Sequence, residues 1–231
     1  MMKKIVFILS FLMLSMAINA QVWKAETIVS ESEVDNSRLD KWFTIDTISN
    51  AVFSRMKGKS YSSKCTISKN NLRYLKVLHR NKEGKIQRGE LVCNKSIAND
   101  LIDIFRQLYL KNYAIERMVL VDEYDANDEK SMTANNTSCF NFRFVTGSKV
   151  VSKHGQGRAI DINPLYNPCY NTRNGLTEPA AGKPYATKRT GKQGSISLIN
   201  TQDLCYKLFI SHGFKWGGSW KSKKDYQHFE K

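Results

Sequence analysis

The chain lacks internal repeats, low-complexity tracts and proline-rich linkers, and it holds only four prolines among its 231 residues. After residue 17 no apolar run is long, so no membrane-spanning helix is expected in the rest of the chain. There is no Cys-x-x-Cys pair, which argues against a zinc site built from cysteines. These absences exclude repeat and integral membrane proteins and favour one domain with a substantial core.

The first 20 residues have the composition of a secretory signal peptide. Lys3 and Lys4 precede an apolar run over residues 5–17, and the small residue Ala20 stands just before Gln21. No cysteine follows this expected cleavage site, so no lipoprotein anchor is expected. We therefore expect residues 1–20 to be removed and the remainder to be exported, as a soluble protein of the periplasm or the extracellular space. An uncleaved anchor or a buried helix is the alternative.

Acidic residues are scarce relative to basic ones. The 36 Lys and Arg residues outnumber the 21 Asp and Glu residues, giving a formal net charge of +15. Such a balance suggests a polyanionic neighbour, such as a cell wall or a membrane surface. The lysines are spread along the chain and no aromatic–basic binding motif stands out, so nucleic acid is not expected as a partner. A solvated basic surface without a specific partner is the alternative.

The cysteines are odd in number, and their spacing assigns no pairing. An exported protein can form disulfides, but at least one thiol then stays unpaired unless it bridges another chain. The five are Cys65, Cys93, Cys139, Cys169 and Cys205.

Hydrophobic patterning predicts an α+β domain over residues 46–231, preceded by a loose, polar N-terminal arm over residues 21–45. We expect a first helix at 46–56, capped by Asp46 and stopped by Gly58. Two β-prone runs, 72–79 and 86–93, flank a polar turn and predict a hairpin.

Later segments complete this α+β prediction. Apolar residues at helical spacing predict a helix over 97–109 with Ser96 as its cap. Residues 118–121 are expected to form a buried strand. A further helix is expected over 198–211, ended by Gly213.

Two imidazoles and a carboxylate stand out as candidate metal ligands: His154, Asp161 and His228. The first two are seven residues apart. Glycines at 155 and 157 disfavour regular structure at the histidine, so we expect a turn there. The segment 159–162 resembles a strand start that places Asp161 on the face opposite its apolar neighbours. Three ligands of this type leave a fourth position for water at a catalytic zinc ion.

Other titratable residues are assigned by their position relative to these three. Asp225 lies three residues before His228, where a carboxylate can sit beside metal-bound water and act as a general base. Glu230 is the next candidate for that role, although we interpret it as structural or as a support of the ligands. His79, in a strand-like run, and His212, at a helix end, are weaker ligand candidates.

Together these residues form the pattern S-x-H-x-x-G-x-A-x-D over residues 152–161 and D-x-x-H-F-E over residues 225–230. This combination resembles the D-alanyl-D-alanine carboxypeptidase family of zinc peptidases. That group also contains bacterial dipeptidases, L-alanyl-D-glutamate endopeptidases and, by fold, the hedgehog signalling domain. Residues 135–143, 163–168 and 216–221 are similar to neighbouring family segments, so the resemblance extends from about residue 56 to the C-terminus.

The resemblance implies a small antiparallel sheet with flanking helices and one zinc ion per chain. It implies His154, Asp161 and His228 as ligands and Asp225 as the base. Arg143 matches an arginine that contacts substrate, at a peptide carboxylate or an oxyanion, with a structural ion pair as the alternative.

Three further side chains have roles that the resemblance leaves open. Ser152 is expected either to hydrogen-bond near the scissile group or to cap its own turn. Trp216 and Trp220 are expected to pack the last strand and to wall the cleft, without binding substrate directly.

The resemblance predicts a peptidase of peptidoglycan stem peptides, with D-Ala-D-Ala carboxypeptidase activity as the first expectation. Many carboxypeptidase and dipeptidase members carry Glu as the base, so Asp225 favours an L-alanyl-D-glutamate-type endopeptidase as the alternative. A non-enzymatic, zinc-bearing cell-wall binding module and a peptidase of secreted peptides are further alternatives. The oligomeric state is left open.

Overall fold

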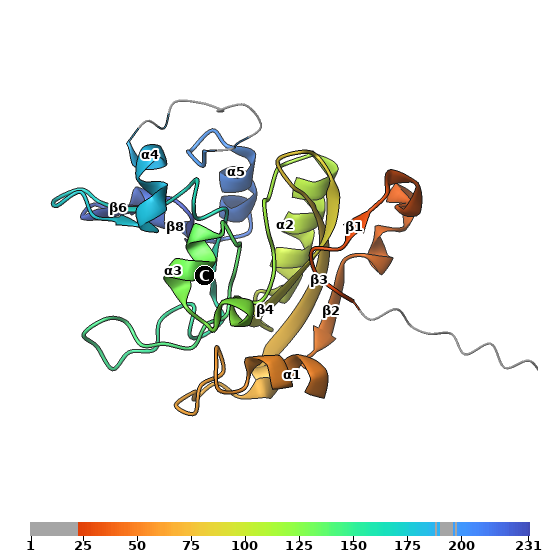
Figure 1. Cartoon of the computed structure of the whole chain (residues 1–231), viewed down its shortest axis with the longest axis horizontal. Helices are drawn as coiled ribbons and strands as arrows, with labels where there is room; N and C mark the ends of the chain where they lie inside the picture. The colour runs from red at the N-terminus through yellow and green to blue at the C-terminus, as the bar shows by residue number, and fades with distance from the viewer. Residues whose placement is uncertain (1–22, 188, 190–195, 197) are drawn as a thin grey trace, which may run out of the picture.

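A four-stranded antiparallel sheet forms the first half of the protein. The structure is a computed structural model that describes residues 23–187, 189, 196 and 198–231, so the expected signal peptide lies outside the described residues. The strand order is β1-β4-β3-β2 (Figure 1). The strands are β1 (Ile28–Val29), β2 (Thr44–Thr47), β3 (Leu72–Arg80) and β4 (Ile86–Asn94). Strands β3 and β4 pair along their whole length, which confirms the predicted hairpin.

Helix α2 (Ala98–Leu110) packs on β3 and on helix α5 (Leu204–Ser211). Its buried side chains recur at the helical spacing seen in the sequence, including Leu101, Phe105 and Leu108. The predicted helix is therefore confirmed, but its cap is wrong. Ser96 does not cap it: Ile97 occupies the N-cap position, and among the described residues no side chain accepts a hydrogen bond from the first turn.

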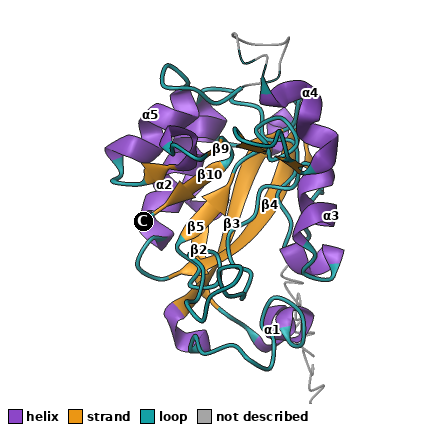
Figure 2. Cartoon of the chain, turned by 90° about the vertical axis from the view of Figure 1, so that its left-hand side faces the viewer, coloured by secondary structure: helices purple, strands orange, loops and turns teal. Residues whose placement is uncertain are grey.

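Two small antiparallel sheets follow in the second half. One has the order β5-β10-β8 and the other β7-β6-β9. Their strands are β5 (Ala159–Asp161), β6 (Cys169–Asn171), β7 (Thr177–Glu178), β8 (Lys215–Trp216), β9 (Lys223–Asp225) and β10 (His228–Glu230). Figure 2 shows β5 and β10 lying beside the long hairpin strands, with α3 (Asp128–Thr133) on one flank and α5 on the other.

One hydrophobic cluster joins the two halves. Ile160 of β5 and Phe229 of β10 are fully buried in the same cluster as Leu91 of β4 and Leu101 of α2. The Phe229 ring stacks on Phe209 of α5, with ring centroids 4.3 Å apart. Helices and small antiparallel sheets around a shared core confirm the predicted α+β class.

The remaining helices are short. In the part of the chain that the structure describes, they are α1 (Asn50–Met56), α4 (Lys183–Ala186) and six 3₁₀ helices: Glu31–Glu33, Asn36–Lys41, Lys69–Asn71, Val121–Tyr124, Ala180–Gly182 and Gly217–Ser219. Among the described residues, no helix has the length and apolar character needed to cross a bilayer. The five cysteines all fall within the described residues, and each is a free thiol.

The N-terminal arm predicted over residues 21–45 is not loose in its described part. Strand β1 pairs with β4, and β2 begins at Thr44 and pairs with β3. Leu39 and Phe43 are buried in the main core. The prediction failed because these apolar residues follow no regular period, so only tertiary packing shows that they are core residues.

The first predicted helix begins later than expected. Asp46 lies in strand β2, and Ser49 caps the helix by accepting a hydrogen bond from the Val52 amide. Its end is as predicted, since it stops at Met56, just before Gly58 with its positive φ of 80°.

Two later segments also differ from their predictions. The predicted strand over 118–121 is absent: Val121 begins a 3₁₀ helix, and residues 118–120 are buried without strand pairing, because the Asn136 side chain bonds both the amide and the carbonyl of Val119. The helix predicted over 198–211 begins only at Leu204, where Asp203 supplies the cap, and Leu198 is buried ahead of it.

Candidate metal centre

Strands β5 and β10 bring two of the candidate ligands together. They pair antiparallel, with Asp161 directly opposite His228 and Ile160 directly opposite Phe229. Because side chains alternate along a strand, the apolar pair enters the core while Asp161 and His228 share the other face. Burial of Ile160 and Phe229 therefore fixes the register that makes two residues 67 positions apart into neighbours.

The third candidate comes from a tight turn between residues 152 and 158. The Ser152 hydroxyl accepts a hydrogen bond from the Gly155 amide at 2.9 Å, and the His154 carbonyl accepts one from the Gly157 amide. Gly157 has a φ of +68°, and a Cβ there would lie 2.8 Å from the Asn94 amide nitrogen. Only glycine fits this left-handed position against strand β4, so the turn holds His154 in place.

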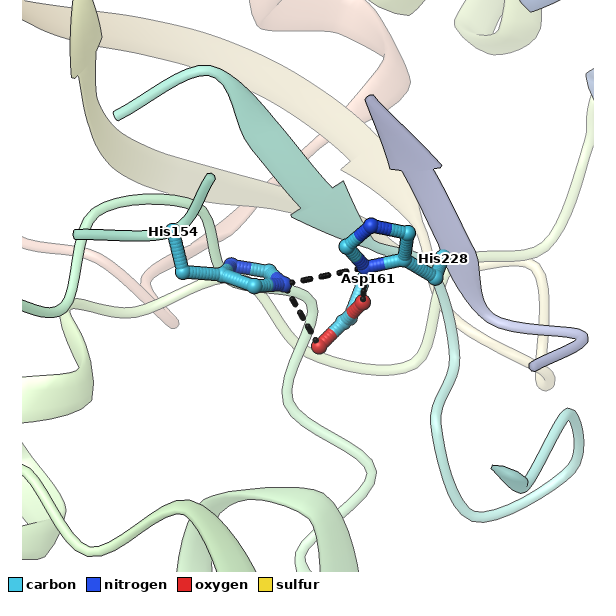
Figure 3. A group of neighbouring side chains, drawn as sticks. All are labelled: His154, Asp161 and His228. Atoms are coloured by element: carbon cyan, nitrogen blue, oxygen red, sulfur yellow. Dashed lines mark hydrogen bonds and ion pairs between the residues drawn. The ribbon is translucent and has the colours of Figure 1, made fainter. Parts of the chain in front are cut away.

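The three side chains converge on one point (Figure 3). His154 Nε2 lies 3.2 Å from His228 Nδ1 and 3.3 Å from Asp161 Oδ2, and His228 Nδ1 lies 3.2 Å from Asp161 Oδ1. In a tetrahedral zinc site with bonds of about 2.0–2.1 Å, neighbouring ligand atoms lie about 3.3 Å apart. The two histidines contact different oxygens of Asp161, but one atom from each of the three residues can be chosen so that all lie within 4.8 Å of one another, and this donor set fits a zinc ion.

The outward atoms of both imidazoles are already engaged. His154 Nδ1 lies 2.8 Å from the Cys139 carbonyl oxygen, and His228 Nε2 lies 3.1 Å from Glu230 Oε2. A neutral ring that donates its N–H to these acceptors keeps the lone pair of its other nitrogen for a metal. His154 is thus set to bind through Nε2 and His228 through Nδ1. The sequence analysis had anticipated Glu230 only as a general support.

Electrostatics at the centre favour a cation. Burial acts to lower the pKa of His228, but hydrogen bonds to Asp161 and Glu230 outweigh it and raise the pKa to about 10. Burial acts to raise the pKa of Asp161, but the two neighbouring histidines hold it well below its usual range. The carboxylates that favour a proton on His228 equally favour a bound metal ion.

Asp225 lies at the end of strand β9, beside this centre. It pairs with Cys169 of β6 and is only 8% exposed. One carboxylate oxygen, Oδ2, lies 3.8 Å from Lys223 Nζ, while Oδ1 is buried without a hydrogen-bond partner. Burial raises the pKa of Asp225; nearby Asp161 adds to this rise and His228 opposes it.

Gly217 explains how Asp225 and His228 come so close, and the sequence analysis missed its role. A Cβ at Gly217 would lie 2.7 Å from the Asp225 carbonyl oxygen, 2.8 Å from Asp225 Cβ and 3.2 Å from His228 Cβ. The two side chains therefore begin side by side against a residue that has none. The Gly-Gly pair after Trp216 was the available signal.

Trp216 and Trp220 have different surroundings and different roles. Trp216 is buried, and its indole N–H donates to the Tyr226 carbonyl at 2.9 Å. The Trp220 ring lies 5.2 Å from the His228 ring and carries Lys223 Nζ 5.0 Å from its centroid. Trp216 therefore packs the last strand, while Trp220 stands against a candidate ligand.

Arg143 and Ser152 lie on the chain leading into the ligand turn. Arg143 Nε contacts Asp128 Oδ2 at 3.1 Å, and its side chain is 37% exposed. The Ser152 amide donates to the Arg143 carbonyl, and the Ser152 hydroxyl caps the turn. The structure thus shows the ion pair and the turn cap, the two structural alternatives raised from the sequence.

The two weaker histidine candidates stand apart from the centre. His79 Nδ1 lies 2.7 Å from the Ile115 carbonyl oxygen, and His212 bonds Asp103 and the Leu208 carbonyl. Neither joins the cluster of candidate metal ligands among the described residues. A cavity of about 710 Å³ between the hairpin tip and α5 holds none of the candidate residues either.

The segment before the ligand turn supports strand β5. The Ser138 and Asp161 backbones exchange two hydrogen bonds, and the Thr137 hydroxyl accepts from the Asn163 amide. Asn135 and Asn136 use their side-chain oxygens to accept from the Leu165 and Val119 amides. This Asn-Asn-Thr-Ser segment therefore fixes backbone around Asp161.

Comparison with protein families agrees with this centre. Residues 146–231 match the sequence model of a family described as D-alanyl-D-alanine carboxypeptidase. The matched range contains His154, Asp161, Asp225 and His228, and the match confirms the predicted family resemblance over this part of the chain. It indicates a peptidase. No curated protein and no solved structure matches the chain.

Proposed function

We propose that this protein is a zinc-dependent peptidase that cleaves peptidoglycan stem peptides. The observation that carries the proposal is the cluster of His154, Asp161 and His228, in which the facing atoms of each pair of residues lie 3.2–3.3 Å apart. The buried Oδ1 of Asp225, which has no hydrogen-bond partner, lies beside this cluster. A structural zinc site has no need of an additional buried carboxylate, which argues against the non-enzymatic binding module. The likeness to the hedgehog fold is part of the same proposal.

His154, Asp161 and His228 would hold one zinc ion per chain. When bound, zinc lowers the pKa of a water molecule and polarises the scissile carbonyl. Asp225 Oδ1 then accepts the proton of the attacking water and passes it to the leaving amine. The low exposure of Asp225 keeps bulk water from competing for that oxygen.

Arg143 is proposed to bind the substrate. Its guanidinium presents a planar fork that matches a carboxylate, and its side chain is accessible beside the ion pair with Asp128. A free C-terminal carboxylate held there makes the enzyme a carboxypeptidase that removes a terminal D-Ala. Ser152 contributes through the turn that positions His154.

A second cleavage specificity is supported by the identity of the base. Aspartate is one methylene shorter than the glutamate common among carboxypeptidase members, so the water must approach the chain more closely. This difference favours an endopeptidase that cuts between L-Ala and the D-Glu-type residue, with Arg143 steadying an oxyanion. The same active-site chemistry would also serve a peptidase of secreted peptides.

Location and partners belong to the same proposal. The basic N-terminal leader supports export to the periplasm or the extracellular space. The net charge of +15, of which Lys3 and Lys4 of the leader supply only two, suits an anionic wall. Nucleic acid is not proposed as a partner.

The test compares free-acid and C-terminally amidated stem peptides with purified protein and zinc. A carboxypeptidase loses turnover on amidation and also in Arg143→Lys, because lysine keeps the charge but cannot form the bidentate fork. Equal rates on both peptides would reject the carboxypeptidase and leave the endopeptidase. Digestion of purified peptidoglycan, with identification of the new termini, decides between wall and other peptides.

A matched pair of variants tests the base. Asp225→Asn is expected to keep zinc and to lose turnover roughly 100-fold or more, as is typical of a positioned acid–base group. Asp128→Asn makes the same chemical change at the aspartate that pairs with Arg143, so it should affect substrate binding and not proton transfer. Near-normal turnover in zinc-loaded Asp225→Asn would move the base role to another residue.

A further inference from the structure

A loop with an apolar tip projects from the body just before the ligand turn. Its two arms meet in a bridge between Phe144 and Val151, and the Val145 amide donates to the Val150 carbonyl at 2.8 Å. In Figure 1 this green-to-teal loop extends away from the helices and sheets. We refer to residues 144–151 as the 144–151 loop.

The tip exposes apolar side chains that have no cover in the structure. Phe144 is 40% exposed, Val145 48% and Val150 63%. The other large exposed apolar residues of the described chain occur singly, on β1, α2, the turn between β6 and β7, and α5: Ile28, Leu110, Leu176 and Ile210. Single exposed apolar residues are ordinary, whereas three at one tip mark a contact surface.

The tip is held in one shape by its own hydrogen bonds. The Ser148 amide donates to the Val145 carbonyl at 2.9 Å, and the Val150 amide donates to the Ser148 hydroxyl at 3.0 Å. One side of this apolar surface is tied to the core, because the Phe144 ring lies edge-on to the buried Phe142 ring, with centroids 5.6 Å apart. The apolar surface is therefore preformed and anchored in the core.

The sequence around the tip is basic. Residues 130–160 contain no Asp or Glu, but five basic residues: Lys130, Arg143, Lys149, Lys153 and Arg158. Of these, Arg143 is paired with Asp128, so Lys149 and Lys153 are the cations that the loop offers a partner. Lys149 is exposed within the loop itself, and Lys153 follows two residues after its end. An apolar tip with cations at its base is complementary to a surface that is apolar inside and anionic at its rim.

We propose that the 144–151 loop docks on an anionic lipid bilayer surface. Phe144, Val145 and Val150 enter the headgroup region, while Lys149 pairs with lipid phosphate. Because the contact is small, binding is reversible and weakens as salt screens the lysine. The loop leads directly into Ser152 and the His154 turn, so docking presents the candidate metal centre to peptides displayed near that surface.

Vesicle co-sedimentation tests this proposal. The probes are vesicles of phosphatidylcholine alone and of phosphatidylcholine with phosphatidylglycerol at 3:1. The tip variant is Val145→Ser with Val150→Ser. Its matched control is Ile28→Ser with Leu176→Ser, which removes apolar groups of similar exposure from other elements. Thermal unfolding and zinc content establish that each variant is folded.

The wild type and the control are expected to bind the anionic vesicles alike, and the tip variant roughly tenfold less strongly. Lys149→Gln should weaken binding and reduce its salt dependence, whereas the exposed Lys111→Gln should change neither beyond a small charge effect. Hydrolysis of a water-soluble stem peptide should be unchanged in the tip variant. The docking proposal and the peptidase proposal can therefore fail separately.

Three results would overturn the docking proposal. The first is no preference of the wild type for anionic vesicles at low salt. The second is an equal loss in the tip and control variants, which assigns binding to net charge alone. The third is a dimer that the tip variant abolishes, which makes a second copy of the chain the occupant.

Discussion

Replacing Glu230 tests whether the outward contacts of the imidazoles prepare the metal centre. Glu230 Oε2 lies 3.1 Å from His228 Nε2, and no other hydrogen bond from that nitrogen is present in the described structure. Loss of such an orienting partner weakens metal binding by about 10–100-fold in known sites. Because the Glu230 side chain is 25% exposed, water can partly replace it, so we expect the lower end. Glu230→Ala should therefore bind zinc about tenfold less tightly, equivalent to about 1.4 kcal/mol.

Competition against a chelator of known zinc affinity measures this change directly. Glu230→Gln keeps an oxygen acceptor and should lose less affinity than Glu230→Ala. Glu83→Ala, at the tip of the β3–β4 hairpin, is a control that should bind zinc like the wild type. Nitrogen-15 spectra of the zinc-loaded protein should show a protonated Nε2 and a metal-bound Nδ1 on His228. Unchanged affinity in Glu230→Ala, or zinc bound through Nε2, would refute the reasoning.

Two further predictions concern the packing of buried groups. Gly217→Ala places a Cβ within 2.8 Å of Asp225, so it should lower the free energy of unfolding by about 1–3 kcal/mol and weaken zinc binding. Chemical denaturation and chelator competition measure the two effects. If the variant matches the wild type in both, the segment adapts to the added methyl group and the prediction is wrong. Burial lowers the pKa of His79 to about 4, so the unfolded chain takes up more protons between about pH 6.5 and 4 and stability falls as pH drops through that window. The free energy of unfolding of the metal-free protein should fall by about 2 kcal/mol between pH 7 and 5 because of His79, and that of His79→Gln should fall correspondingly less. Urea denaturation at a series of pH values measures both. The same pH dependence in the two proteins would show that His79 is not the cause.

Local sequence patterns predicted the helices and strands whose formation depends mainly on their own residues. The β3–β4 hairpin has β-prone runs on both sides of a polar turn, and α2 has a continuous apolar face. Residue type, together with the family resemblance, also singled out His154, Asp161 and His228, and the structure brings these three side chains together in one cluster that could hold a metal ion. The hairpin and the helix needed only residue type and spacing.

The features that failed depend on partners far away in sequence. Val119 forms no strand because the side chain of Asn136 takes both of its backbone hydrogen bonds. Leu39 and Phe43 are core residues only because the sheet and α2 lie against them. The closeness of Gly217 to Asp225, and of Glu230 to the outer nitrogen of His228, follows from tertiary geometry that no local pattern encodes.

The zinc content of the wild type and of His154→Ala tests the central claim most directly. Elemental analysis after dialysis should find one zinc per wild-type chain and much less in His154→Ala, because removing Nε2 leaves only two of the three converging ligands. His212→Ala, which removes a histidine outside the centre, should keep its zinc. One zinc per chain in His154→Ala, or none in the wild type, would contradict the account.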